Sequence, residues 1–151
     1  MRNLIRITLL FMCGTALIAA QSGELIHTAA EQTPFTVVSS AQLIAAAVGT
    51  TLPGDADDLS IEDVQALGYR IPRRRPDQAV TKGQFALLLM QFFDYRGGLR
   101  YELLATPTAA FRELQDDGIF TAWELPGEEL SGAEALEVVS FVLQLDRAEE
   151  R

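Results

Sequence analysis

The chain has 151 residues, of which 12 are Lys or Arg and 21 are Asp or Glu, so its formal net charge is −9. This acidic balance argues against general nucleic-acid binding and against adhesion to anionic lipid, because both depend on clustered basic side chains. The one cysteine excludes a disulfide within the chain, and the length suffices for one hydrophobic core.

The first 20 residues have the plan of a secretory signal peptide. Arg2 and Arg6 precede an apolar run over residues 7–20, which ends in small residues and is followed by polar ones. We expect cleavage near Ala20, and therefore a periplasmic or extracellular protein that is peripheral to a membrane at most.

Two alternatives to cleavage remain at this end of the chain. Ile18 stands where a signal peptidase prefers a small residue, so the run could be retained as an anchor. Cys13 could be lipidated, although no small side chain precedes it as a lipidation motif requires.

Residues 21–37 predict a flexible lead, and residues 38–151 a single folded domain. The lead is polar and aperiodic as far as Pro34, while the β-branched triplet Thr36-Val37-Val38 is too short to tell a strand from an extended entry.

Helix start and stop signals then recur to the end of the chain. Each predicted helix begins at Ser or Thr, and several end at Gly. The predicted helices cover residues 39–48, 60–67, 81–93, 106–117 and 131–145.

An internal repeat relates these helices. A shift of 50 positions brings residues 61–93 onto residues 111–143 without a gap, matching Gly68 with Gly118 at a helix stop and Thr81 with Ser131 at an N-cap. Residues 38–48 look like the second helix of a further copy, with Ser39 and Gln42 in the cap positions. The sequence therefore predicts an all-α fold, a compact helical bundle of two helix-loop-helix repeats and an N-terminal half repeat.

The repeat plan resembles S-layer homology repeats. The helix starts Val80-Thr81-Lys82-Gly83-Gln84 and Leu130-Ser131-Gly132-Ala133-Glu134 are similar to the Ile-Thr-Arg-Ala-Glu motif of that family. The resemblance implies binding to a cell-wall polysaccharide, in which the motif arginine takes part. This chain has Lys82 and Gly132 at that position, so the resemblance implies the fold more strongly than the ligand.

A basic loop interrupts the acidic chain between the two helices of the first full repeat. Arg70, Arg73, Arg74 and Arg75 fall within a stretch of six residues, and guanidinium groups bind carboxylates and phosphates in a bidentate way. The loop is either a site for an anionic polymer or an acidic partner surface, or a solvated segment that balances charge within the molecule.

The aromatic residues are expected to pack in the core and between the repeats, since most fall at helical core spacing; they are Phe85, Phe92, Phe93, Phe111, Phe120, Trp123 and Phe141. Phe120 and Trp123 leave an exposed alternative open. Both lie in the loop of the second repeat, where they could stack on a sugar ring or enter a partner's pocket. Tyr95 and Tyr101 flank Arg96-Gly97-Gly98, a glycine-bearing connection that could act as a hinge.

No catalytic, cofactor or metal motif is expected. Starting from Asp55, an EF-hand register places Ser60 and Ala66 where glycine and glutamate are needed, and His27 lies in the flexible lead without a second ligand nearby. Paired acids such as Asp116-Asp117 are ordinarily solvent-facing charges, so we expect a protein that is not an enzyme.

Two functions from different classes are therefore expected. One is a protein-interaction subunit that docks on an envelope protein, and the other is a module that binds an anionic wall polymer. The candidate contact residues are Arg70, Arg73, Arg74, Arg75, Lys82, Phe120 and Trp123.

Overall fold

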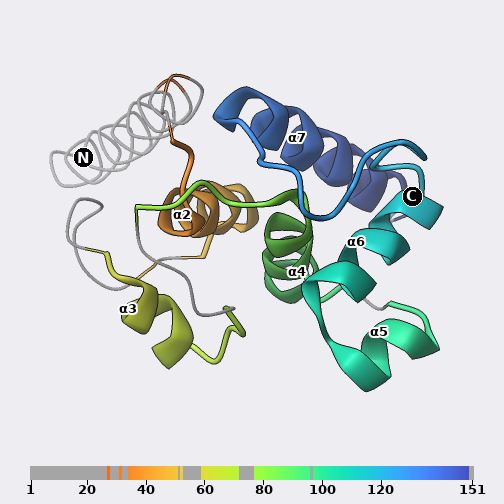
Figure 1. Cartoon of the computed structure of the whole chain (residues 1–151), viewed down its shortest axis with the longest axis horizontal. Helices are drawn as coiled ribbons and strands as arrows, with labels where there is room; N and C mark the ends of the chain where they lie inside the picture. The colour runs from red at the N-terminus through yellow and green to blue at the C-terminus, as the bar shows by residue number, and fades with distance from the viewer. Residues whose placement is uncertain are drawn as a thin grey trace, which may run out of the picture.

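The fold is all-α in a computed structural model that describes residues 27, 31, 34–50, 52, 59–71, 77–95 and 97–149. These residues form six helices and no strand (Figure 1). The helices are α2 (Val37–Val48), α3 (Ile61–Ala66), α4 (Lys82–Phe92), α5 (Leu99–Leu104), α6 (Pro107–Asp116) and α7 (Gly132–Glu149). The signal segment, the arginines at positions 73 to 75 and the aspartates at positions 55 to 58 lie outside this description.

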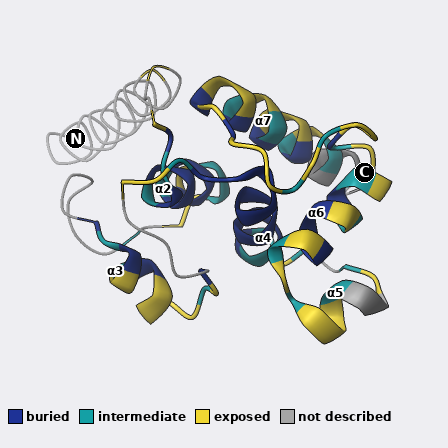
Figure 2. Cartoon of the chain, in the orientation of Figure 1, coloured by how far each residue is buried: buried dark blue, intermediate teal, exposed yellow. Residues whose placement is uncertain are grey.

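Helix α4 occupies the centre of the molecule. Every residue from Thr81 to Met90 is buried, and the helix packs against α2 and α6 (Figure 2). A helix that is buried on all sides needs apolar residues around its whole circumference, and Phe85-Ala86-Leu87-Leu88-Leu89-Met90 supplies them.

Three short chain segments meet just before the starts of α2, α4 and α7. The Val80 N–H donates to the Phe35 carbonyl at 2.8 Å, and the Leu130 N–H donates to the Val80 carbonyl at 2.9 Å. The side chains of Phe35, Val80 and Leu130 are all buried, so these backbone hydrogen bonds hold the three helix starts against one core.

The two predicted repeats share local geometry at the expected shift of 50 residues. Gly68 and Gly118 both take positive φ, 92° and 78°, a backbone conformation that L side chains rarely adopt. Thr81 and Ser131 both accept a hydrogen bond from the backbone N–H three residues on, and a Gln or Glu side chain there accepts from the cap N–H in return.

The start of α2 differs from the prediction. Its N-cap is Thr36, whose Oγ1 accepts from the Ser39 N–H at 3.3 Å, so the predicted cap positions Ser39 and Gln42 are both wrong by three residues. Val37 and Val38 form the first turn of the helix instead of a strand or an extended entry, because threonine is also a favourable N-cap residue.

The connection after α4, where Arg96-Gly97-Gly98 could act as a hinge, leads into helix α5 and is held to the end of α6. The Tyr95 hydroxyl donates to Asp117 Oδ2 at 2.6 Å, and the Gly98 N–H donates to Glu113 Oε2 at 3.0 Å. Both partners are carboxylates on the last turns of α6, which no local sequence signal pairs with this connection.

Candidate functional site

The loop between α6 and α7 is held in shape at both ends. After Gly118, the Ile119 and Phe120 N–H groups both donate to the Leu114 carbonyl, at 2.8 and 3.3 Å. Further on, the Thr121 hydroxyl and N–H donate to the Glu124 carboxylate, which closes a turn. The loop therefore presents its remaining side chains from a fixed backbone.

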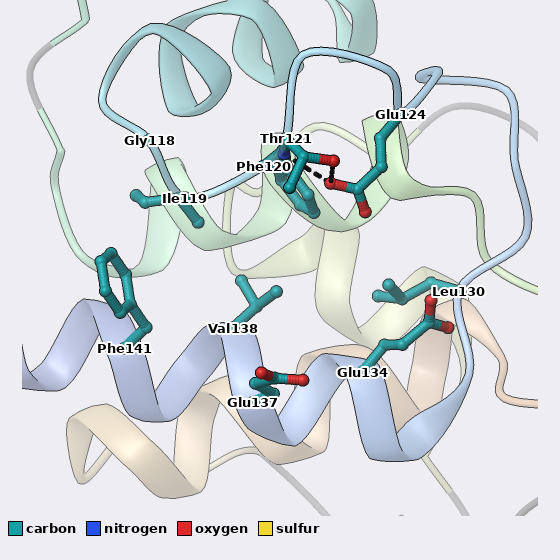
Figure 3. A pocket seen from close by; sticks show the side chains of 10 residues that line it. All are labelled: Gly118, Ile119, Phe120, Thr121, Glu124, Leu130, Glu134, Glu137, Val138 and Phe141. Carbon is teal, nitrogen blue, oxygen red and sulfur yellow. Dashed lines mark hydrogen bonds between the residues drawn. The ribbon is translucent and has the colours of Figure 1, made fainter.

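A groove of about 260 Å³ lies between this loop and α7. Figure 3 shows Val138 and Phe141 of α7 facing Ile119 of the loop, with Glu134 toward the opposite end. The groove lining combines apolar side chains with three carboxylates, and consists of Gly118, Ile119, Phe120, Thr121, Glu124, Leu130, Glu134, Glu137, Val138 and Phe141.

Lys82 lies behind the acidic end of the groove and is surrounded by glutamates. Its side chain is 8% exposed, and its Nζ lies 2.7 Å from Glu124 Oε1, 3.3 Å from Glu128 Oε2 and 3.7 Å from Glu134 Oε1. The loop and the first turn of α7 are thereby linked to the first turn of α4.

These contacts shift the pKa values of the cluster. Burial alone would lower the pKa of Lys82, but the hydrogen bonds to Glu124 and Glu128 and the nearby carboxylate charges outweigh burial and raise it. Burial likewise opposes ionisation of Glu124, yet Lys82 and the donors of Thr121 lower the Glu124 pKa. Donation from the Ser131 hydroxyl and N–H lowers the pKa of Glu134. All these groups are therefore charged at neutral pH.

Large apolar side chains are exposed on the loop and on α7. Trp123 is 80% exposed and Leu125 56% exposed, on either side of Glu124 in the loop, and Phe141 of α7 is 43% exposed. The core prediction is wrong for both Trp123 and Phe141, and Trp123 instead takes the exposed alternative that its loop position left open. Phe141 lies on the groove-facing side of α7, where no other described helix covers it fully.

Phe120, the other predicted loop aromatic, lies in the core. It is 3% exposed and stacks on Phe111 with the ring centroids 4.8 Å apart. The Phe120 ring is therefore enclosed by the core. It lines the groove from below and does not offer an open face to a sugar.

The predicted basic residues do not form one site with Lys82 in the described part of the chain. Arg70 is exposed, and its backbone N–H and carbonyl are both hydrogen-bonded to the side chain of Gln91. Arg73, Arg74 and Arg75 lie outside the described residues. Lys82 is enclosed by carboxylates, so an anion reaching it would meet their charge first.

Sequence reasoning missed the glutamates that define this site. Glu124 and Glu128 approach Lys82 across more than 40 residues of sequence, and adjacent acids in a loop look like solvated charges. The one available signal was the position of Lys82 at a buried helix start, which requires a counter-charge.

None of the helices in the described ranges is long and apolar enough to span a bilayer. Within the same ranges, no group of three His, Cys, Asp or Glu side chains has an arrangement that could hold a metal ion.

Comparison of the chain with family models, with curated proteins and with solved structures finds no match.

Proposed function

We propose that the chain is an exported, non-catalytic cell-envelope protein that docks on a partner protein of the envelope. The observation that carries the proposal is the 80% exposure of Trp123 on a loop with a hydrogen-bonded backbone. Tryptophan is enriched among the residues that dominate protein interfaces, and a fixed loop loses little conformational freedom on binding.

Neighbouring side chains extend this surface beyond one residue. Leu125 follows Trp123 on the same loop, and Phe141 lies in the groove that the loop forms with α7. Exposed apolar side chains that gather around a groove are typical of a docking surface, whereas scattered ones are ordinary.

The acids of the groove support a binding role over a catalytic one. A glycosidase needs a carboxylic acid whose pKa is raised, so that it can donate a proton near neutral pH. The pKa values of Glu124 and Glu134 are instead lowered, because Lys82, Thr121 and Ser131 stabilise their ionised forms.

Export rests on the plan of residues 1–20. The proposal places the folded domain in the periplasm or outside the cell. A fusion of the full chain to an alkaline phosphatase that lacks its own signal should give active phosphatase, since this enzyme matures only after export. An inactive fusion that accumulates in the cytoplasm would overturn the localisation.

The second candidate is an S-layer homology-like module that binds an anionic wall polysaccharide. The matching capping boxes at Thr81 and Ser131 and the matching glycine conformations favour descent from a duplicated helix-loop-helix unit. One observation disfavours polysaccharide binding at Lys82. Its positive charge is already paired with three glutamates, so binding would have to rely on Arg70 and on the arginines at 73 to 75. We therefore place this candidate second.

A retention experiment separates the two candidates. Residues 21–151, which contain α2 to α7, are immobilised and exposed to detergent-solubilised envelope proteins and, separately, to deproteinised wall from the same cells. We expect retention of a defined envelope protein that Trp123→Ala abolishes and that Leu67→Ala, a change to an exposed leucine at the end of α3, leaves intact.

A different result would support the second candidate. Salt-sensitive binding to deproteinised wall, lost when Arg73, Arg74 and Arg75 become alanine, would overturn the docking proposal and support polysaccharide binding.

A further inference from the structure

We infer that the groove between the Gly118–Leu130 loop and α7 receives an extended polypeptide segment of the partner that carries an apolar side chain followed by basic ones. This inference rests on the proposed docking function and specifies the chemistry of the partner. It follows from the arrangement of apolar and acidic groups along the groove.

The groove is divided along its length. One end is walled by Ile119, Val138 and Phe141, and the other by the carboxylates of Glu124 and Glu134, with Glu137 between them on α7 (Figure 3). A ligand that fills the groove must therefore present apolar surface at one end and positive charge at the other.

Among the residues that the structure describes, the carboxylates at the groove outnumber the cations that contact them. Glu124, Glu128 and Glu134 share the one ammonium group of Lys82. The Glu137 side chain is exposed and has no hydrogen bond or ion pair with any residue that the structure describes. The excess negative charge attracts cations and repels anionic polymers, phosphate groups and acidic peptides.

The spacing of these groups suits an extended chain. Glu137 and Glu134 precede Phe141 by four and seven residues on α7, which is about 6 and 10 Å at the rise of an α-helix. Two and three residues of extended chain span about the same distances. Side chains two residues apart on an extended chain point to the same side, so an arginine two residues after a leucine faces Glu137 when the leucine faces Phe141. A further arginine at the next position starts on the other side of the extended chain and adds positive charge near the acidic end of the groove.

The direct test is calorimetric titration of residues 21–151 with the peptide Gly-Ser-Leu-Ser-Arg-Arg-Ser-Gly. Two control peptides replace both arginines by glutamate, or the leucine by serine. We expect the first peptide to bind at least about tenfold more tightly than either control, and its affinity to fall with added salt.

Variants on α7 then assign the contact. Glu137→Gln should weaken binding of the first peptide roughly threefold and Glu137→Lys about tenfold, because a reversed charge adds repulsion to the lost attraction. Glu62→Gln, at an exposed glutamate of α3, is the matched control and should leave the affinity unchanged. Amide NMR shifts on peptide addition should map to residues 119–141.

The outcomes separate this inference from the proposed function. Equal binding of all three peptides, or no binding of any, overturns the inference, while Trp123-dependent retention of an envelope protein would still support docking. Peptide shifts that map outside the groove overturn it as well. If no envelope protein is retained, the proposed docking function is overturned, and the inference that rests on it is overturned with it.

Discussion

Lys82 is a cation in the first turn of an α-helix, where the helix dipole favours negative charge. It is tolerated there because three carboxylates lie within 3.7 Å of its ammonium group. The same contacts hold the loop that displays Trp123, so one side chain links the core to the docking surface.

Replacement of this lysine tests that link. Lys82→Met keeps an unbranched side chain of similar volume but leaves Glu124 and Glu134 without the lysine counter-charge, and should lower the free energy of unfolding by about 2 kcal/mol. Glu128→Gln, which removes a more exposed partner, should cost about 0.5 kcal/mol or less. Urea unfolding followed by circular dichroism measures both, and equal stability of Lys82→Met and the natural chain would refute the structural role.

The pKa shifts of the same cluster predict how stability depends on pH. A carboxyl group whose pKa is lower in the folded state binds its proton more weakly there, so acid favours unfolding. Glu124 and Glu134 should therefore stabilise the fold above pH 4.5, their ordinary pKa, and this contribution should disappear as the pH falls through their folded values. Lys82 has a raised pKa, so its contribution should be lost only above pH 10.5.

The measurement is the urea midpoint across this range. We expect a plateau between these limits and a decline on the acid side, and Glu124→Gln should lower the plateau and flatten the decline. A midpoint that rises steadily as the pH drops below 4.5 would contradict the assignment.

Among the helices, α4 makes an unusually close contact at its start. The Lys82 and Gly83 N–H groups donate to the Glu128 and Pro126 carbonyls at 2.8 and 2.9 Å, so the α6–α7 loop caps α4 from outside. This approach is possible because Gly83 has no side chain: a Cβ there would lie 2.9 Å from the Pro126 oxygen.

Gly83→Ala should therefore destabilise the protein, although alanine is the better helix former. The clash is with backbone atoms, which yield little, so we expect a loss of about 2 kcal/mol in the free energy of unfolding. Gly127→Ala, where an added Cβ meets nothing within 4 Å, is the control and should be neutral. Thermal unfolding of the two variants gives the comparison, and a stabilised Gly83→Ala would show that the loop moves freely.

Helix starts were the most predictable features of this chain, and contacts across the sequence the least. The capping boxes at Thr81 and Ser131 and the stops at Gly68 and Gly118 are local, because their partners lie within a few residues. Helix α5 was missed, since Tyr95 and Gly98 are fixed by α6 and not by their neighbours.

At the candidate site, the loop position of Phe120 and Trp123 left both core packing and exposure open, and only the fold shows that Phe120 packs on Phe111 while Trp123 is exposed. The glutamates around Lys82 come from a loop and a helix that only the fold brings together. Sequence therefore located the loop that carries the site, and packing decided which of its side chains face outward.

The whole molecule has one core to which every predicted repeat contributes. Phe35 and Ile44 of the N-terminal part, Val80 and Leu88 of the middle part and Phe111 of the last part are all buried in it. No repeat encloses its own apolar residues, so the three parts should unfold together.

Ile44→Ala tests this cooperativity from the N-terminal end. The side chain is fully buried in α2, so its truncation should lower the free energy of unfolding by about 3 kcal/mol. We expect one urea transition, shifted as far as that of Leu114→Ala in α6. Two resolved transitions, with α2 lost first, would show that the N-terminal half repeat is only attached to the rest.

Trp123 is also the only tryptophan of the chain, and its indole already contacts water in the folded state. Its emission should therefore change little when the protein unfolds, which makes it a poor optical probe of folding. Covering the same ring by a bound partner removes water from it and should shift the emission to shorter wavelength. The natural chain thus carries a built-in fluorescent reporter of occupancy that needs no label.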